Sequence, residues 1–175
     1  MKKYLLILGM MLLGTTASFA DEGDKWLGVN LNYGFSSEYK NFGIGGKFQY
    51  EIKPNLRLEG AANYFFSRSV GEDYGDLRTW MLDANANVQY LIHLTDRLNV
   101  YPILGPSLLF AKASDKDGGF TDHFTGSRVR LGVNIGAGIE YQLNDHLKAN
   151  ADFKYQYHKD FDRPVIAVGV SYYWQ

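Results

Sequence analysis

The chain contains no cysteine, so neither a disulfide nor a lipid-modified cysteine can be invoked for it. Its 18 basic and 19 acidic residues give a formal net charge of −1, which is too small to indicate a nucleic-acid partner. No long hydrophobic run follows the first 20 residues, and this excludes a spanning helix there. Glycine and aromatic residues are abundant, with 19 Gly, 13 Tyr, 11 Phe and 3 Trp. Such a composition is typical of a β-barrel, although by itself it also allows a soluble one.

The first 20 residues have the pattern of an export signal. Two lysines precede an apolar run over residues 4–13, and Ser18 and Ala20 stand where a signal peptidase reads small residues. The alternative is a membrane anchor, but the run is shorter than the roughly 20 residues that a spanning helix needs. We therefore expect export through the Sec pathway, cleavage after Ala20 and one mature domain over residues 21–175.

Alternation of apolar and polar residues with a period of two predicts β-strands, because successive side chains of a strand point to opposite faces. The pattern is clearest around Val133, Asn134 and Ile135. It is weakest where Pro102 and Pro106 occur, since proline cannot donate a hydrogen bond to a β-ladder. The eight expected strands cover residues 26–35, 42–52, 56–67, 79–92, 98–111, 129–142, 147–157 and 165–174.

The connections between these segments alternate between short and long. Tight turns are expected at residues 53–55, 93–97 and 144–146. The other connections are generally longer and richer in Asp, Gly and Ser, and cover residues 36–41, 68–78, 112–127 and 158–164. This alternation predicts an eight-stranded antiparallel up-and-down transmembrane β-barrel with periplasmic turns and extracellular loops.

Side-chain volume indicates which face of the barrel points outward. The interior of an eight-stranded barrel is just wide enough to be filled by side chains, and the bulky apolar face would not fit there. The Gly, Ala, Ser and Asn of the other face would fit, so the bulky face should meet lipid. Its aromatic residues gather into two girdles, which are Tyr33, Phe35, Phe42, Tyr64, Phe66, Trp80, Phe110 and Tyr157 at the loop end, and Tyr50, Tyr90, Tyr141, Tyr172 and Trp174 at the turn end.

The same parity places ten charged side chains in the lumen: Lys47, Glu51, Arg57, Glu59, Asp83, Arg130, Glu140, Lys148, Asp152 and Lys154. Five are basic and five are acidic. Isolated charges there would be strongly disfavoured, so we expect ion pairs, with Arg57 bound to Glu51 or Glu59 and Lys148 bound to Glu140. Such a network is either a static polar core that fixes strand register or a gate that opens a narrow conduit.

Enzymatic and metal-binding roles have little support. The four histidines, at positions 93, 123, 146 and 158, lie in expected turns, a loop or a loop edge, and none is followed two residues later by a serine. Acyl-transfer chemistry needs a nucleophile beside a base held by a third group. Asp115, Asp117 and Asp122 lack the glycine and glutamate spacing of a calcium site. We expect no catalytic residue, no cofactor site and no metal site.

Three segments of the chain match a known pattern: the signal ending at residues 17–20, the glycine-rich strand at residues 131–141 and the aromatic strand at residues 168–174. Gln175 departs from this pattern, which usually ends on an aromatic residue. The resemblance is to the small OmpA-like and OmpX-like barrels of bacterial outer membranes. It implies contact with outer-membrane lipid and lipopolysaccharide. It also implies that the strand carrying Tyr172 and Trp174 is read by the barrel-assembly machinery.

Three functions follow as hypotheses. The first is an envelope-integrity or surface-interaction role, in which the extracellular loops contact a ligand and a polar ion-pair network fills the lumen. The alternative is a small porin or transporter for ions or minor solutes. A lipid A-modifying barrel enzyme is the third and least supported.

Overall fold

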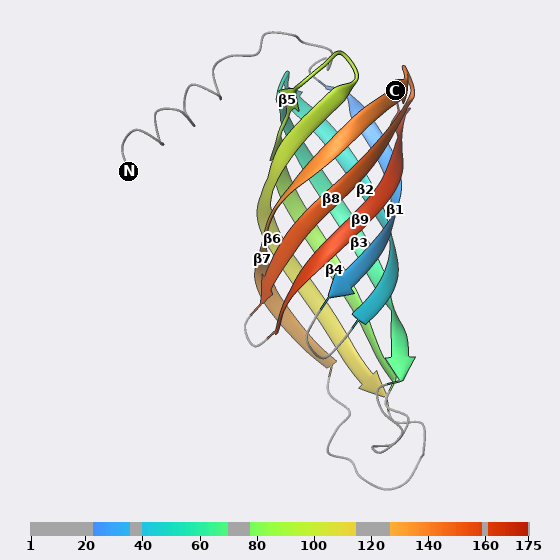
Figure 1. Ribbon diagram of the computed structural model, residues 1–175. Helices are drawn as coiled ribbons and strands as arrows, with labels where there is room; N and C mark the ends of the chain where they lie inside the picture. Colours follow the sequence, from blue (N-terminus) through green and yellow to red (C-terminus); the bar gives the residue numbers. More distant parts are fainter. Residues whose placement is uncertain (1–22, 36–39, 70–77, 115–126, 159–160, 175) are drawn as a thin grey trace, which may run out of the picture.

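The computed structural model describes residues 23–35, 40–69, 78–114, 127–158 and 161–174, which form a closed barrel of β-strands (Figure 1). Its strands are β1 (Lys25–Phe35), β2 (Lys40–Lys53), β3 (Leu56–Ser69), β4 (Arg78–Tyr90), β5 (Ile92–His93), β6 (Leu98–Ser114), β7 (Ser127–Asn144), β8 (Leu147–His158) and β9 (Phe161–Trp174). Over the described residues no helix is long and apolar enough to span a membrane.

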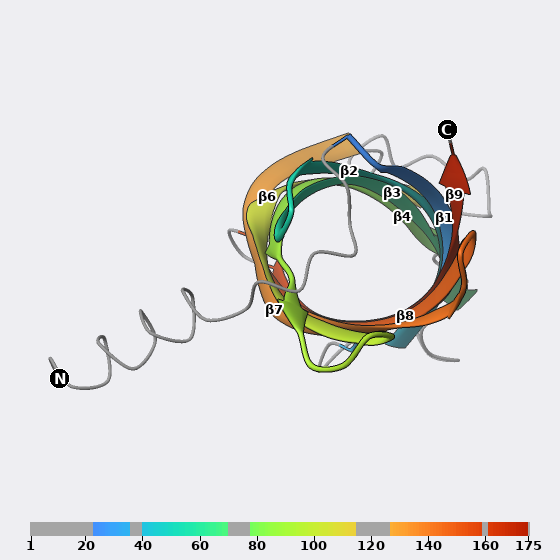
Figure 2. The same cartoon turned by 90° about the horizontal axis from the view of Figure 1, so that it is seen from above.

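Apart from β4 and β5, strands that are neighbours in the sequence pair antiparallel, and β1 pairs with β9 to close the ring (Figure 2). The short β5 continues β4 after Leu91, and both pair with β6. Counted together, β4 and β5 form one wall strand, so the barrel has eight strands. The all-β, eight-stranded, up-and-down fold expected from the sequence is confirmed. A closed ring suits a membrane wall because it leaves no edge of unpaired backbone groups in hydrocarbon.

Three short connections lie at one end of the barrel, which we call the turn end. They cover residues 54–55, 94–97 and 145–146, and the C-terminal end of β9 lies at this end as well (Figure 1). The opposite end is called the loop end. Its connections, at residues 36–39, 70–77, 115–126 and 159–160, lie outside the described residues.

The strands at the loop end are longer than the sequence pattern predicted. β3 continues to Ser69 and β6 to Ser114. The largest correction concerns β9, which begins at Phe161, although residues 158–164 were expected to form a loop. Proline removes one ladder donor but leaves its neighbours able to pair, and residues on both sides of Pro164 pair with β8.

The two prolines of β6 are also contained in a continuous strand. The ladder between β6 and β7 runs without interruption through Pro102 and Pro106. On the other side, pairing with β4 stops after the pair of Ser107 with Asn85 and resumes at the pair of Leu104 with Val88. Although its sequence pattern was the weakest, β6 is a continuous strand of 17 residues.

The wall has an apolar outer face and a mainly polar inner face. The exposed fraction is 71% for Leu131 and 64% for Val29, whereas Asn134 and Asp83 are fully buried. Exposed aromatic side chains occur near both ends, with Phe42, Tyr64, Phe66 and Tyr157 at the loop end and Tyr50, Tyr141, Tyr172 and Trp174 at the turn end. The side chain of Trp80 lies outside the described part of the chain. The bulky face thus points outward, as the volume argument required.

Candidate functional site in the barrel lumen

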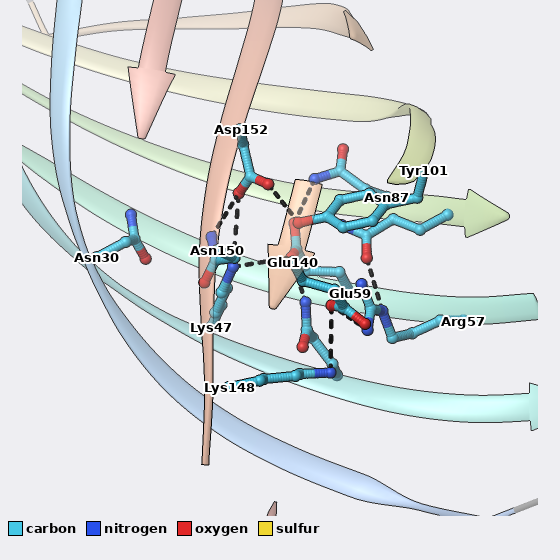
Figure 3. Close-up of polar contacts among 12 residues, drawn as sticks. Asn30, Lys47, Arg57, Glu59, Asn87, Tyr101, Glu140, Lys148, Asn150 and Asp152 are labelled. Atoms are coloured by element: carbon cyan, nitrogen blue, oxygen red, sulfur yellow. Dashed lines mark hydrogen bonds and ion pairs between the residues drawn. The ribbon is translucent and has the colours of Figure 1, made fainter. Parts of the chain in front are cut away.

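Polar side chains on the inner face contact one another across the lumen, and Figure 3 draws the contacts around Lys47, Arg57 and Asp152. They come from every wall strand because each strand directs alternate residues inward. Where such groups lose water, they need hydrogen bonds or opposite charges to offset the cost.

At the turn end, Arg57 on β3 reaches across the lumen to β7. Its Nη1 donates to Glu140 Oε2 at 2.8 Å and its Nε donates to the Gln89 side-chain oxygen at 2.7 Å. Glu140 also lies 3.4 Å from Lys148 Nζ and accepts from Asn99 at 3.1 Å. The expected pair of Lys148 with Glu140 is therefore present, and Arg57 binds the same carboxylate.

Of the two carboxylates that were expected to pair with Arg57, only Glu51 lies near its guanidinium. Glu51 Oε1 lies 3.9 Å from Arg57 Nη1, a distance that allows electrostatic attraction but not a hydrogen bond. Glu59 does not pair with Arg57, although it was an expected partner. The two residues lie on the same face of β3, but the guanidinium extends across the barrel toward β7, and Glu59 pairs instead with Lys47 of β2 at 3.7 Å.

In the middle of the lumen, Lys47 links two carboxylates. Its Nζ lies 3.5 Å from Asp152 Oδ2 in addition to its contact with Glu59. Tyr101 donates to the other oxygen of Asp152 at 2.5 Å, and Arg57 lies over the Tyr101 ring with its Cζ 4.9 Å from the centroid. The central and turn-side clusters therefore share contacts through Arg57 and Tyr101.

Asparagine side chains connect the centre to the loop-side half. Asn63 accepts from Asn30 and from Asn32, at 3.0 Å each, and donates to Asp83 at 2.6 Å. Asn134 donates to the side-chain oxygens of residues 85 and 87, at 2.8 and 3.0 Å. An amide both donates and accepts, so it can join neutral and charged groups in one network.

At the loop end, Arg163 on β9 forms an ion pair with Asp83, with Nη2 and Oδ2 separated by 2.9 Å. The guanidinium also lies 4.0 Å from the centroid of the Phe65 ring. Phe65 belongs to a buried apolar cluster with Met81, Leu109 and Val165. We call these four residues the loop-end cluster, and it places apolar side chains across the lumen at this level.

Nine of the ten predicted lumen charges are at most 4% exposed, and the tenth, Arg130, is half-buried. Lys154 is buried on the inner face of β8. Sequence reasoning missed Arg163, which is 2% exposed, because it lies beside Pro164 in a segment taken for a loop. The available signal was the parity of β9, since position 163 lies on the same face as positions 167 and 171.

Two of the described histidines each lie within hydrogen-bond distance of a neutral polar side chain. His158 lies 3.2 Å from the Ser107 hydroxyl, and both residues are buried. His93 Nδ1 lies 2.6 Å from Asn99 Oδ1. Over the described ranges, no three His, Cys, Asp or Glu side chains are grouped so that they could hold a metal ion. His123 and the aspartates at positions 115, 117 and 122 lie outside these ranges.

The C-terminal strand closes the barrel between its two partners. Leu27 of β1 and Leu147 of β8 both pair with Tyr172, and Lys25 pairs with Trp174. The side chains of Tyr172 and Trp174 are each 57% exposed on the outer face. Tyr173, between them, points inward, where its hydroxyl donates to Asp24 at 3.0 Å and its ring meets that of Trp26 with centroids 5.3 Å apart.

Several solved structures share this fold. The attachment invasion locus protein Ail of Yersinia pestis aligns with a TM-score of 0.61 and 18% identity over 88% of this chain and 100% of its own. Neisserial surface protein A aligns with a TM-score of 0.60 and 18% identity over 85% of this chain and 95% of its own. OprG from Pseudomonas aeruginosa aligns with a TM-score of 0.61 and 15% identity over 88% of this chain and 97% of its own.

At these identities, the structural matches show the fold and no more. The sequence search of curated proteins returned no match. The family comparison covers nearly the whole chain, because the model of the outer membrane protein beta-barrel domain matches residues 6–173. The chain therefore belongs to this family of bacterial outer-membrane β-barrels.

Proposed function

We propose that this protein is a non-conducting, non-enzymatic barrel that contributes to envelope integrity and presents its loops to an extracellular ligand. The observation that carries the proposal is the balanced and cross-linked charge of the lumen. Among the described residues, the basic side chains buried there are Lys47, Arg57, Lys148, Lys154 and Arg163, and the acidic ones are Glu51, Glu59, Asp83, Glu140 and Asp152. Charges that neutralise one another across the lumen hold opposite strands together, and they leave little net charge to attract a permeating ion.

The loop-end cluster supports a closed lumen. Phe65 and Leu109 are at most 1% exposed, and Arg163 lies over the Phe65 ring while bound to Asp83. An ion crossing this level would lose its hydration among apolar side chains. Opening the lumen would require the Arg163–Asp83 pair and the packing around Phe65 to be disrupted together.

A non-enzymatic role agrees with the placement of Ser107 and His158. A serine nucleophile must be reached by a substrate and needs a base oriented by a third group. These two residues are 1% and 2% exposed and face the lumen. A lipid substrate would have to displace the network around them, so we interpret the contact as part of the core.

The proposed partners follow from the location of the family. We propose Sec-dependent export, insertion by the barrel-assembly machinery, and contact with lipid and lipopolysaccharide in the outer membrane. The names of Ail, an attachment invasion locus protein, and of a neisserial surface protein are consistent with surface interaction as a use of this fold.

Single-channel recording in planar bilayers tests whether the lumen conducts. The wild-type barrel is expected to give no stable openings. The double substitution Phe65→Ala and Arg163→Ala should introduce them, because it removes the ring and the cation that lies over it. Phe66→Ala, on the lipid-facing side of the same strand, is the matched control and should remain silent. Stable openings of the wild type would instead support the small-porin alternative.

A further inference from the structure

A cavity of about 480 Å³ opens at the turn end of the lumen and is not explained by the proposed function. Its rim includes Arg97 and Asp145, which belong to the β5–β6 and β7–β8 turns. Deeper in the cavity, Glu51, Glu140 and Lys148 line its wall. The cavity is therefore a recess of molecular size at one mouth of the barrel, bounded inward by the turn-side ion pairs.

Glu51 faces this recess with an incompletely satisfied carboxylate. It is 2% exposed, its Oε2 accepts no hydrogen bond from the protein, and its Oε1 lies 3.9 Å from Arg57. Glu140 in the same recess interacts with Arg57, Asn99 and Lys148 at 2.8, 3.1 and 3.4 Å. A buried charged acceptor without a donor is costly, and a guest that donates to Glu51 Oε2 after a rotation of this side chain would offset that cost.

Trp26 supplies the complementary group. Its indole Nε1–H is buried in the wall of the same recess and donates to no acceptor of the protein. Trp26 pairs with Gln49, two residues from Glu51 on the adjacent strand β2. The ring is held in place by Tyr173 on one side and by Lys148 Nζ, which lies 4.1 Å from its centroid. The wall of the recess thus holds one unpaired acceptor and one unpaired donor on neighbouring strands, and both atoms become accessible to a guest only when these side chains rotate.

The charged residues that line the recess determine which sign of charge a guest should carry. The charged lining residues are the acidic Asp24, Glu51, Asp96, Glu140 and Asp145 and the basic Arg97 and Lys148. This excess of acidic groups in a recess attracts a cation. No three metal-ligating side chains are grouped within the described ranges, so directional N–H donors suit the recess better than a bare ion.

We propose that this recess binds a small primary ammonium compound that also carries an oxygen acceptor, such as an amino alcohol. The ammonium group donates to Glu51 Oε2 and the oxygen accepts from Trp26 Nε1. The inference goes beyond the proposed function, because it concerns the turn end and needs neither the loops nor a closed lumen.

Solution NMR of the mature barrel in detergent micelles tests the proposal. Ethanolamine is titrated while the indole N–H signals of the three tryptophans are followed, with Trp26 assigned through Trp26→Phe. The expected result is a saturable shift of the Trp26 signal. Ethylamine, which lacks the oxygen, should bind more weakly, and ethylene glycol, which lacks the charge, should not bind. A shift that does not saturate, or equal affinity for ethylene glycol, would overturn the proposal.

Two variants separate a built site from a general attraction of cations. Glu51→Gln should weaken ethanolamine binding at least about tenfold, since it removes the charged acceptor. Asp96→Asn removes the same charge from the exposed rim and should change the affinity less than about twofold. Equal weakening by both variants would mean that only the overall potential acts, and the proposal would fail.

Electrophoretic mobility without boiling reports that each variant is folded. If Glu51→Gln does not fold, Trp26→Phe carries the test. Binding to this variant is followed through the backbone amide signals of Glu51 and Glu140, and ethanolamine should then bind no better than ethylamine does. Nanodiscs distinguish two sources of the ligand. A shifted Trp26 signal in phosphatidylethanolamine discs but not in phosphatidylglycerol discs, without added amine, would assign the guest to a lipid headgroup. If the Trp26 signal is unshifted in both kinds of disc and moves to the bound position only when ethanolamine is added, the guest is a free compound.

Discussion

Arg57 is the residue on which most of the turn-side network depends. It is fully buried, binds Glu140 and Gln89, and lies over Tyr101. Arg57→Ala should lower the free energy of unfolding by roughly 3–5 kcal/mol if the site stays dry, and by less if water enters the space. The urea midpoint of the refolded barrel measures this loss.

Two comparisons make the Arg57 result specific. Arg57→Lys keeps the charge but lacks the planar fork that reaches Glu140 and Gln89 together, so it should fall between wild type and alanine. Arg97→Ala removes an exposed guanidinium and should cost less than about 1 kcal/mol. Similar midpoints for Arg57→Ala and Arg97→Ala would contradict a paired interior at this level.

Gly138 provides a second test at the residue scale, because a side chain at this position has no room. A Cβ at Gly138 would collide with Asp152 Oδ1 and with the Tyr101 ring, and would lie 2.6 Å from Tyr101 Cζ. Gly138→Ala should therefore destabilise the barrel by about 1–3 kcal/mol through overpacking. It should also displace Tyr101 from Asp152, which a change in tyrosine fluorescence or near-UV circular dichroism would report.

Gly60 is the matched control for Gly138. It lies on the outer face of β3, and a Cβ there would meet nothing within 4 Å. Gly60→Ala should leave the urea midpoint unchanged or raise it slightly, since alanine has fewer unfolded conformations to lose. If the two alanine variants unfold alike, the close contact at Gly138 does not limit the packing of the lumen.

At the scale of the element, period-two alternation predicted the eight strands, and the alternation of short and long connections predicted their topology. The period-two pattern did not predict the strand ends. It placed Pro164 in a loop and the start of the last strand at residue 165, whereas β9 begins at Phe161. Parity also identifies inward-facing residues but not their partners. Arg57 and Glu140 are 83 positions apart and meet across the lumen, which depends on strand stagger and side-chain reach that local periodicity does not contain.

The closing strand β9 carries the prediction that belongs to this scale. Deleting residues 172–175 removes the pairs of Tyr172 and Trp174 with β1 and exposes backbone groups that cost several kcal/mol each in hydrocarbon. The truncated protein should still be exported and processed, but it should accumulate in the periplasm or be degraded. Fractionation and mobility without boiling measure both steps.

A substitution distinguishes closure from interfacial anchoring in β9. Tyr172→Leu with Trp174→Leu keeps the backbone pairs and the apolar outer face but removes both aromatic rings. If the rings act only as anchors, this variant should insert with lower stability, whereas failure to insert would indicate that the assembly machinery reads them. Normal insertion of the truncated chain would show that the end of β9 is not needed for closure.

At the scale of the whole molecule, the two ends of the lumen differ. The loop end carries the loop-end cluster of apolar side chains, and the turn end carries a polar recess with an acidic lining. An eight-stranded up-and-down barrel brings both ends of its wall, the start of β1 and the end of β9, to the same side. The orientation in the membrane therefore decides which compartment each end meets.

Orientation can be measured cleanly because the chain has no cysteine of its own. Barrels of this type place short turns in the periplasm and long loops outside, so Asp145→Cys should resist a membrane-impermeant maleimide in intact cells. Asp117→Cys, in the connection between β6 and β7, should react at once; this position lies outside the described residues and is placed by topology alone. Permeabilising the outer membrane should make Asp145→Cys reactive while leaving the labelling of Asp117→Cys unchanged. Labelling of Asp145→Cys in intact cells would reverse the orientation and expose the acidic recess to the medium.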